Sequence, residues 1–137
     1  EKLPSPRGSS SGLYQGGNYH HRLMTTVDVF RDEQGVRGLR VSGHAGYAKS
    51  GRDIVCAAAS VLITTCANAL ESVAGVMPVI EQDERSTVIC VALPPRLEPG
   101  REHDARVIFR TVLQGFADIA AQYPTYLQIN DGRTSSC

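Results

Sequence analysis

The 137-residue sequence lacks several features that would assign it to a class directly. Its 14 basic and 14 acidic residues leave a formal net charge of +0, which argues against bulk electrostatic capture of nucleic acid. Its longest apolar run, residues 54–63, is too short to span a membrane. Residues 43–46 lack the lysine and flanking pattern of a phosphate-binding loop. We therefore expect a globular domain without direct nucleic-acid or membrane binding.

The four cysteines also lack a recognisable pairing. Cys56, Cys66, Cys90 and Cys137 form no Cys-x-x-Cys motif and have no zinc-like spacing. We predict no metal and no cofactor. Thiols without partners are typical of a reducing compartment, which predicts a cytoplasmic location. Cys66 and Cys90 are expected to be buried, and Cys137 is expected to be an exposed thiol.

The composition changes along the chain and predicts one domain between two polar ends. Residues 1–23 are crowded with Gly, Ser and Pro and contain no apolar block suited to a signal peptide. We interpret them as a disordered leader or an expression remnant. Residues 24–130 are predicted to form the single domain, and residues 131–137 a polar tail. Hydrophobic residues make up 42% of the chain, as expected for a globular protein.

Alternating apolar residues, turn signals and apolar stripes predict an α+β fold. Val27 and Val29 alternate with polar residues, as in a half-buried strand, and the apolar stripe of residues 108–123 is typical of an amphipathic helix. The predicted order is ββαββαβ, with two helices and a mainly antiparallel sheet. The expected elements are a strand around Val27 and Val29, a turn over 31–35, a strand over 36–44, a helix over 54–74, strands over 76–81 and 87–93, a helix over 105–123 and a strand over 126–129.

The first predicted helix is apolar on most of its faces. Glu71 is its only charged residue, and a helix of this kind must be covered on most sides. One sheet covers one side, so a second helix or a partner subunit must cover more. The pattern therefore favours a homodimer.

The stretch from Gly43 to Ser60 is the strongest candidate for a functional site. Asp53 is a good N-cap for the first helix, which would place Cys56 in the first turn. Unpaired amides and the helix dipole there favour the thiolate, the nucleophilic form of cysteine. His44 precedes the helix and can transfer a proton near neutral pH. A cysteine in an alanine-rich helix is more often a small buried hydrophobe, so position alone does not decide.

These residues resemble a known family. Gly43-His44-Ala45, followed by Gly51 to Ala58 (Gly-Arg-Asp-Ile-Val-Cys-Ala-Ala) and by Ser60, is similar to the signature of the ribosomal-processing cysteine proteases, often called Prp. The resemblance extends over residues 24–130. It implies a bacterial endopeptidase that removes the N-terminal extension of a large-subunit ribosomal protein, the one numbered twenty-seven, and it also suggests a homodimer. Ala59 departs from the pattern, where a larger aliphatic residue is expected.

The resemblance assigns roles to individual residues. Cys56 would be the nucleophile and His44 its base, with Gly43, Asp53 and Ser60 in support. Asp53 either caps the helix or also orients His44. Ser60 lies one helical turn after Cys56 and either hydrogen-bonds near the thiol or eases packing. The flexible substrate loop is predicted to comprise Ala45, Gly46, Tyr47, Ala48, Lys49, Ser50, Gly51 and Arg52.

Two other functions fit the same residues. One is a ribosome-associated binding module without chemistry, and the other is a redox-sensing protein that uses Cys56. His103, which precedes the second predicted helix, is the next candidate for a base if His44 does not serve.

Overall fold

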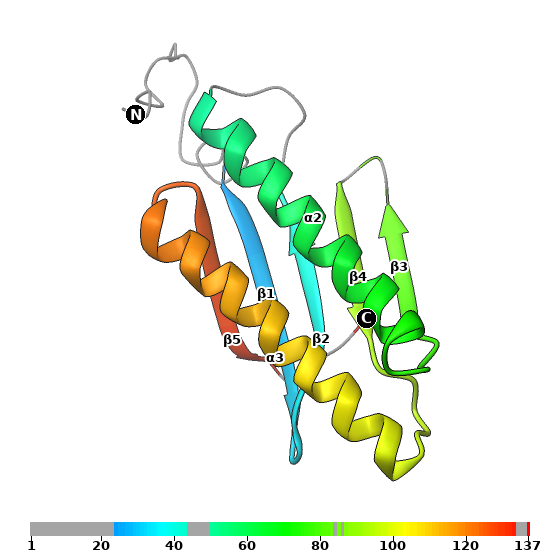
Figure 1. Cartoon of the computed structure of the whole chain (residues 1–137). Coiled ribbons are helices and arrows are strands. Elements are labelled where there is room, and N and C mark those ends of the chain that lie inside the picture. The colour runs from blue at the N-terminus through cyan, green and yellow to red at the C-terminus, as the bar shows by residue number, and fades with distance from the viewer. Residues whose placement is uncertain (1–23, 44–49, 84, 86, 134–136) are drawn as a thin grey trace.

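The computed structural model describes residues 24–43, 50–83, 85, 87–133 and 137. The fold has two layers, with two helices lying across one face of a five-stranded sheet (Figure 1). The elements in chain order are β1 (Thr25–Asp32), β2 (Gly35–Ser42), α2 (Ser50–Ser72), β3 (Val79–Asp83), β4 (Val88–Ala92), α3 (Pro99–Gln122) and β5 (Leu127–Arg133). The predicted α+β class and the order ββαββαβ are confirmed.

The sheet is mixed, with strand order β3-β4-β2-β1-β5. β1 and β2 form an antiparallel hairpin, β2 pairs antiparallel with β4, and β3 pairs antiparallel with β4. β5 pairs parallel with β1, because α3 carries the chain back across the sheet before β5 begins. The prediction of a mainly antiparallel sheet is therefore confirmed.

The core lies between the sheet and the helices. Val29 of β1 pairs with Leu39 of β2, which pairs with Val91 of β4, and all three side chains are fully buried. Phe109 and Phe116 of α3 close this layer with 0% exposure. Burying such side chains stabilises a fold by about 1.5–3 kcal/mol each.

The opposite face of the sheet contains a polar row that the sequence analysis missed. Asp28 of β1 pairs with Arg40 on one side and Asn130 on the other. The Arg40 guanidinium donates to Asp28 Oδ2 at 2.9 and 3.1 Å, and Asn130 Nδ2 donates to Asp28 Oδ1 at 3.1 Å. Arg40 also stacks over Phe30, 5.4 Å from the ring centroid. These contacts compensate for burying a carboxylate.

Helix α2 begins earlier than predicted. It starts at Ser50, so Asp53 lies inside the helix, and the prediction of Asp53 as the N-cap is wrong. Ser50, Gly51 and Arg52, predicted as loop, form the first turn. The sequence misled because the apolar pattern starts only at Ile54, whereas helical backbone requires no apolar side chain in its first turn. Gly75 ends the helical region at φ 69°, and the amide of Val76 donates to the carbonyl of Leu70.

Helix α3 also begins earlier than the apolar stripe. Its first residue is Pro99, preceded by Glu98 as N-cap, whereas the prediction started the helix at residue 105, so His103 is helical. Proline has no amide hydrogen, and its fixed φ suits the first helical position, where no intrahelical donor is needed. Pro99 therefore suits the start of this helix.

Two strand boundaries differ from the predictions. β3 begins at Val79 rather than Val76, because Val76 is buried where α2 ends. β5 continues to Arg133, through residues predicted as polar tail. Arg31 holds Asp131 of this extension through hydrogen bonds of 2.6 and 2.9 Å, which the sequence does not reveal.

The cysteine prediction was wrong at two positions. Cys90 and Cys137 form a disulfide with a Cα–Cα distance of 5.9 Å. Cys90 is buried as predicted, but Cys137 is not an exposed thiol. The two residues are 47 positions apart in the sequence, and only the fold brings the chain end to β4.

One segment of α2, Ile54–Ser72, is long and apolar enough to cross a membrane by length and composition. This segment is longer than the apolar run of residues 54–63 from which no membrane span was predicted. Core helices of soluble proteins pass the same criterion, and α2 packs against α3 and three strands. The feature is weak evidence for a membrane span.

Candidate active site

The chain leaves β2 through Gly43, which has φ 86°. A Cβ atom at this position would collide with the backbone carbonyl of Met24. Only glycine tolerates both the positive φ and this close approach. Gly43 thus sets the direction of the segment that leads to α2. His44 and the predicted loop residues up to Lys49 lie outside the described residues, so their predicted roles stay predictions.

Cys56 is the seventh residue of α2 and is half-buried. The predicted first-turn position is therefore wrong, since the helix starts at Ser50. The attraction of the helix dipole for an anion falls off beyond the first turn. Activation of this thiol would depend mainly on a neighbouring base, rather than on the helix end.

Ser60 is also half-buried and lies one turn after Cys56. The fully buried residues of α2, which include Val55, Ala59 and Ile63, define the stripe that faces the sheet. Successive residues turn by about 100° around the axis, which places Cys56 and Ser60 together beside that stripe. Leu62 lies on the other flank, where it approaches Gly115 of α3. Cys56 and Ser60 consequently share the flank that faces away from α3.

The other cysteines are unsuited to nucleophilic chemistry. Cys66 has 0% exposure, as predicted for a core residue, and burial raises the pKa of its thiol to about 12. Such a thiol stays protonated near neutral pH. Cys90 and Cys137 are joined to each other. Cys56 is therefore the cysteine that combines a thiol with partial exposure.

His103, the second candidate base, is exposed near the start of α3. The two helices run in opposite directions, and the start of α3 lies at the end of the sheet opposite the start of α2 (Figure 1). The structure therefore separates His103 from Cys56.

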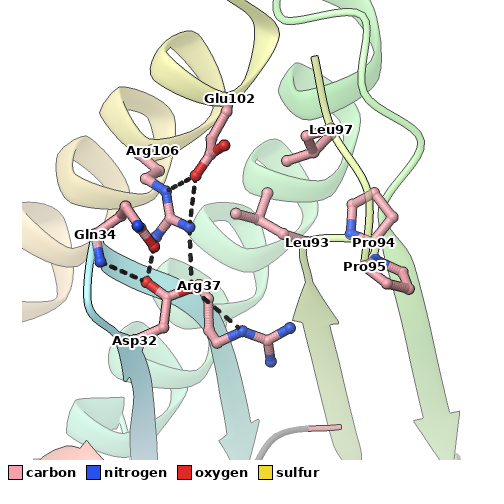
Figure 2. A pocket seen from close by; sticks show the side chains of 9 residues that line it. All are labelled: Asp32, Gln34, Arg37, Leu93, Pro94, Pro95, Leu97, Glu102 and Arg106. Carbon is pink, nitrogen blue, oxygen red and sulfur yellow. Dashed lines mark hydrogen bonds and ion pairs between the residues drawn. The ribbon is translucent and has the colours of Figure 1, made fainter. Parts of the chain in front are cut away.

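A polar pocket of about 270 Å³ lies at that opposite end (Figure 2). It is lined by Asp32, Gln34, Arg37, Leu93, Pro94, Pro95, Leu97, Glu102 and Arg106. β2 separates it from Gly43, and a strand of this length spans about 25 Å. The pocket is therefore distinct from the surroundings of Cys56.

Arg106 forms ion pairs with Asp32 and Glu102 in this pocket. Arg106 donates to both oxygens of Asp32 at 3.0 Å, to Glu102 Oε2 at 3.0 Å and to the carbonyl of Val36 at 3.1 Å. Burial raises the pKa of Asp32, but hydrogen bonds from Arg106 and from the amide of Gln34 outweigh it, so the net pKa lies below its ordinary value. The network joins α3 to the β1–β2 turn and was not predicted.

Within residues 24–43, 50–83, 85, 87–133 and 137, no group of three or more His, Cys, Asp or Glu side chains is placed to hold a metal ion.

Comparison with known proteins identifies the class. A family model described as cysteine protease Prp matches residues 24–128. The ribosomal processing cysteine protease Prp of Bacillus subtilis is 24% identical over 97 residues, covering 71% of this chain and 87% of that protein. The Staphylococcus aureus Mu50 protein of the same name is 28% identical over 108 residues, covering 78% and 98%.

Solved structures with the same fold support this assignment. SMU.848 from Streptococcus mutans has a TM-score of 0.72 and 26% identity, covering 79% of this chain and 93% of that chain. The Prp protease of S. aureus, crystallised with a substrate peptide, has a TM-score of 0.70 and 25% identity, covering 80% and 100%. The fold and these comparisons together identify the chain as a cysteine peptidase. The chain is a member of the Prp family of ribosomal processing cysteine proteases, which confirms the resemblance seen in the sequence.

Proposed function

We propose that this protein removes the N-terminal extension of the large-subunit ribosomal protein numbered twenty-seven, with Cys56 as nucleophile and His44 as base. One observation supports Cys56 most directly. All four cysteines are described, and Cys56 alone joins a thiol to partial exposure. Its place on α2 matches the family signature that contains His44.

The chemistry follows from these two groups. His44 takes the thiol proton, and the Cys56 sulfur attacks the scissile carbonyl carbon to form a tetrahedral intermediate. Collapse breaks the C–N bond while the imidazolium protonates the leaving amine. Water, deprotonated by His44, then attacks the thioester carbonyl and releases the Cys56 thiol. The amide of Cys56 lies beyond the first turn of α2, so we assign the oxyanion donors to other groups.

Asp53, Ser60 and Gly43 support this site in the proposal. Ser60 shares the flank of Cys56, which is consistent with a hydrogen bond near the thiol or with close packing. Asp53 lies within the helix, so orientation of His44 is the role that we keep for it. The residues from Ala45 to Arg52 contact the peptide, with Ser50, Gly51 and Arg52 as the first turn of α2.

The proposal extends to the protein's setting. We infer a cytoplasmic homodimer without direct nucleic-acid or membrane binding. The cytoplasmic location rests on the proposed ribosomal substrate and no longer on unpaired thiols, because Cys90 and Cys137 form a disulfide. Two exposed apolar side chains, Val61 of α2 at 63% and Val73 just after the end of α2 at 70%, support an association through this region.

The experiment is cleavage of the extended ribosomal protein, followed by mass spectrometry. Cys56→Ala and Cys56→Ser should abolish cleavage. Cys66→Ala is the matched control, because it removes a cysteine from the same helix but from the core, and its folded fraction should retain activity. Cleavage by purified Cys56→Ala protein would refute the nucleophile assignment.

Labelling with iodoacetamide distinguishes the alternative functions. A protease thiol activated by His44 should react selectively below the ordinary cysteine pKa of about 8.5. An inert binding module would show no such selectivity, and a redox sensor would show it without peptide cleavage.

A further inference from the structure

β3 is an edge strand that the helices leave uncovered. It pairs with β4 on one side, and it ends the strand order of the described sheet. All five of its residues, Val79–Asp83, are exposed. An edge of this kind presents backbone N–H and C=O groups to any extended chain.

The two faces of β3 differ in chemistry. Glu81 pairs with Cys90, and this row continues to Arg40 and Asp28 on the face opposite the helices. Ile80 pairs with Val91, whose row belongs to the core face, but Ile80 itself is 50% exposed. Because side chains alternate along a strand, one face of β3 presents the carboxylates of Glu81 and Asp83 after Val79, and the other presents Ile80 and the neutral Gln82.

We propose that β3 binds an extended peptide segment in which basic and apolar residues alternate, and that this segment is the part of the substrate remote from the scissile bond. Addition of a strand to an exposed edge supplies backbone hydrogen bonds, while alternate side chains supply specificity. The basic residues lie beside Glu81 and Asp83, and the apolar residues lie beside Ile80. Asp83 also accepts a hydrogen bond from the amide of Arg85, which fixes its carboxylate at the end of the strand.

Charge selects this occupant over a second copy of the chain. β3 contains two acidic residues and no basic residue. Antiparallel pairing with its own symmetry mate would double the number of carboxylates along one ribbon and add no basic side chain from the paired strands. Like charges on neighbouring strands are destabilising, whereas opposite charges are favourable.

Strand register connects β3 to the candidate site. Asp83 pairs with Val88, and the next residue of β4, Ile89, pairs with Val41. The C-terminal end of β3, at Asp83, therefore lies level with the C-terminal end of β2, which Gly43 follows. β3 is two strand spacings from β2, about 10 Å, and a peptide paired with the outer edge of β3 would lie one spacing farther away. At about 3.3 Å per residue, the peptide residues on β3 lie about four or more positions from the cut. This assignment to the substrate rests on the proposed peptidase function.

The binding test uses Cys56→Ala protein and two fluorescein-labelled peptides. One peptide alternates Lys and Val, and the other has the same composition with its lysines grouped at one end. Fluorescence anisotropy should show binding of the alternating peptide that is about fivefold tighter. Glu81→Lys and Ile80→Lys should remove this preference. Asp104→Lys and Val107→Lys, at exposed positions of α3, are the matched controls and should retain it.

A cleavage test addresses the substrate role separately. Glu81→Lys should lower kcat/KM about fivefold for a long basic substrate and leave a peptide trimmed close to the scissile bond unaffected. If Cys56→Ala protein still cleaves, the proposed nucleophile fails while the anisotropy result stands. Equal binding of the two peptides, equal effects of Glu81→Lys and Asp104→Lys, or a change of oligomeric state with Glu81→Lys would each overturn the docking proposal.

Discussion

The two helices share one face of the sheet but differ in what they contribute. α2 buries small and medium side chains, including Ala59 and Cys66, and leaves Val61 exposed at 63%. α3 buries Phe109 and Phe116 completely and is tied to the β1–β2 turn through Arg106. The contrast indicates that α3 stabilises the fold, whereas α2 presents the candidate nucleophile and an apolar surface. Activity and stability should therefore respond to different substitutions.

The largest expected effect falls on activity alone. His44→Ala should lower kcat/KM by about 10²–10⁴-fold, because a general base is removed. Steady-state cleavage of the ribosomal-protein peptide measures this, and urea unfolding should give a midpoint close to that of the unmodified protein. His103→Ala, at the far end of α3, is the control and should keep full activity. Wild-type turnover by His44→Ala would show that another group acts as base.

The converse change is in α3. Phe116→Ala should lower the free energy of unfolding by about 3–5 kcal/mol, since it removes a fully buried aromatic ring. Chemical denaturation measures the loss, and Val107→Ala, at a position that is 41% exposed, should change stability little. The folded fraction of Phe116→Ala should still label at Cys56. If the folded Phe116→Ala protein no longer labels at Cys56, α3 also shapes the site.

The disulfide supplies stability outside both helices. Cys137→Ser opens a link between residues 47 positions apart, and the chain-entropy model predicts a loss of up to about 4 kcal/mol. Treating the unmodified protein with reductant should produce the same shift in thermal unfolding. If neither treatment changes the melting temperature, the bond contributes nothing to the folded state in solution.

The contact between the helices is sensitive to volume. A Cβ on Gly115 would lie 3.0 Å from Cδ2 of Leu62, so Gly115→Leu should separate α3 from α2 and cost about 1–3 kcal/mol. Gly100→Ala is the control, because nothing lies within 4 Å of its added Cβ and alanine favours a helix. Differential scanning calorimetry compares them. Equal melting temperatures would show that Leu62 moves aside without cost.

The smallest effect concerns acid. The folded-state pKa of Asp32 lies below its ordinary value of 3.8, so its stabilising contribution is present above that value and is lost as the pH falls through the lower folded pKa. Asp32→Asn should cost about 0.2–1 kcal/mol at neutral pH, and less at about pH 3. Urea denaturation at both pH values measures the difference. Asp118→Asn, on the exposed face of α3, should show no comparable change.

Hydrophobic pattern predicted the elements but not their ends. Periodicity located both helices, yet Ser50 and Pro99 begin them with residues that carry no apolar signal. Gly132 in β5 resembles turn sequence, and its φ of 88° is not that of a regular strand. The contact between Arg31 and Asp131 nevertheless joins this segment to β1. Contacts across 100 residues leave no trace in local composition.

The candidate site shows the same division. The resemblance named Gly43 as a supporting residue, and the structure gives Gly43 a positive φ of 86°. The family signature also selected Cys56 from four cysteines. The prediction of Asp53 as N-cap was wrong because the start of a helix depends on backbone geometry. The three preceding residues, Ser50 to Arg52, also adopt helical geometry. The disulfide and the Arg106 network were missed, since both depend on positions that only the tertiary fold brings together.

The parallel pairing of β1 with β5 has a consequence for synthesis. A ribosome completes β1, β2 and α2 long before it adds Leu127, which is 1% exposed in the folded protein. Until then β1 is an open edge of the growing chain. A chain released before residue 127 would carry every residue of the candidate site and still lack its last strand. We therefore expect premature termination to yield a product that chaperones retain and proteases degrade.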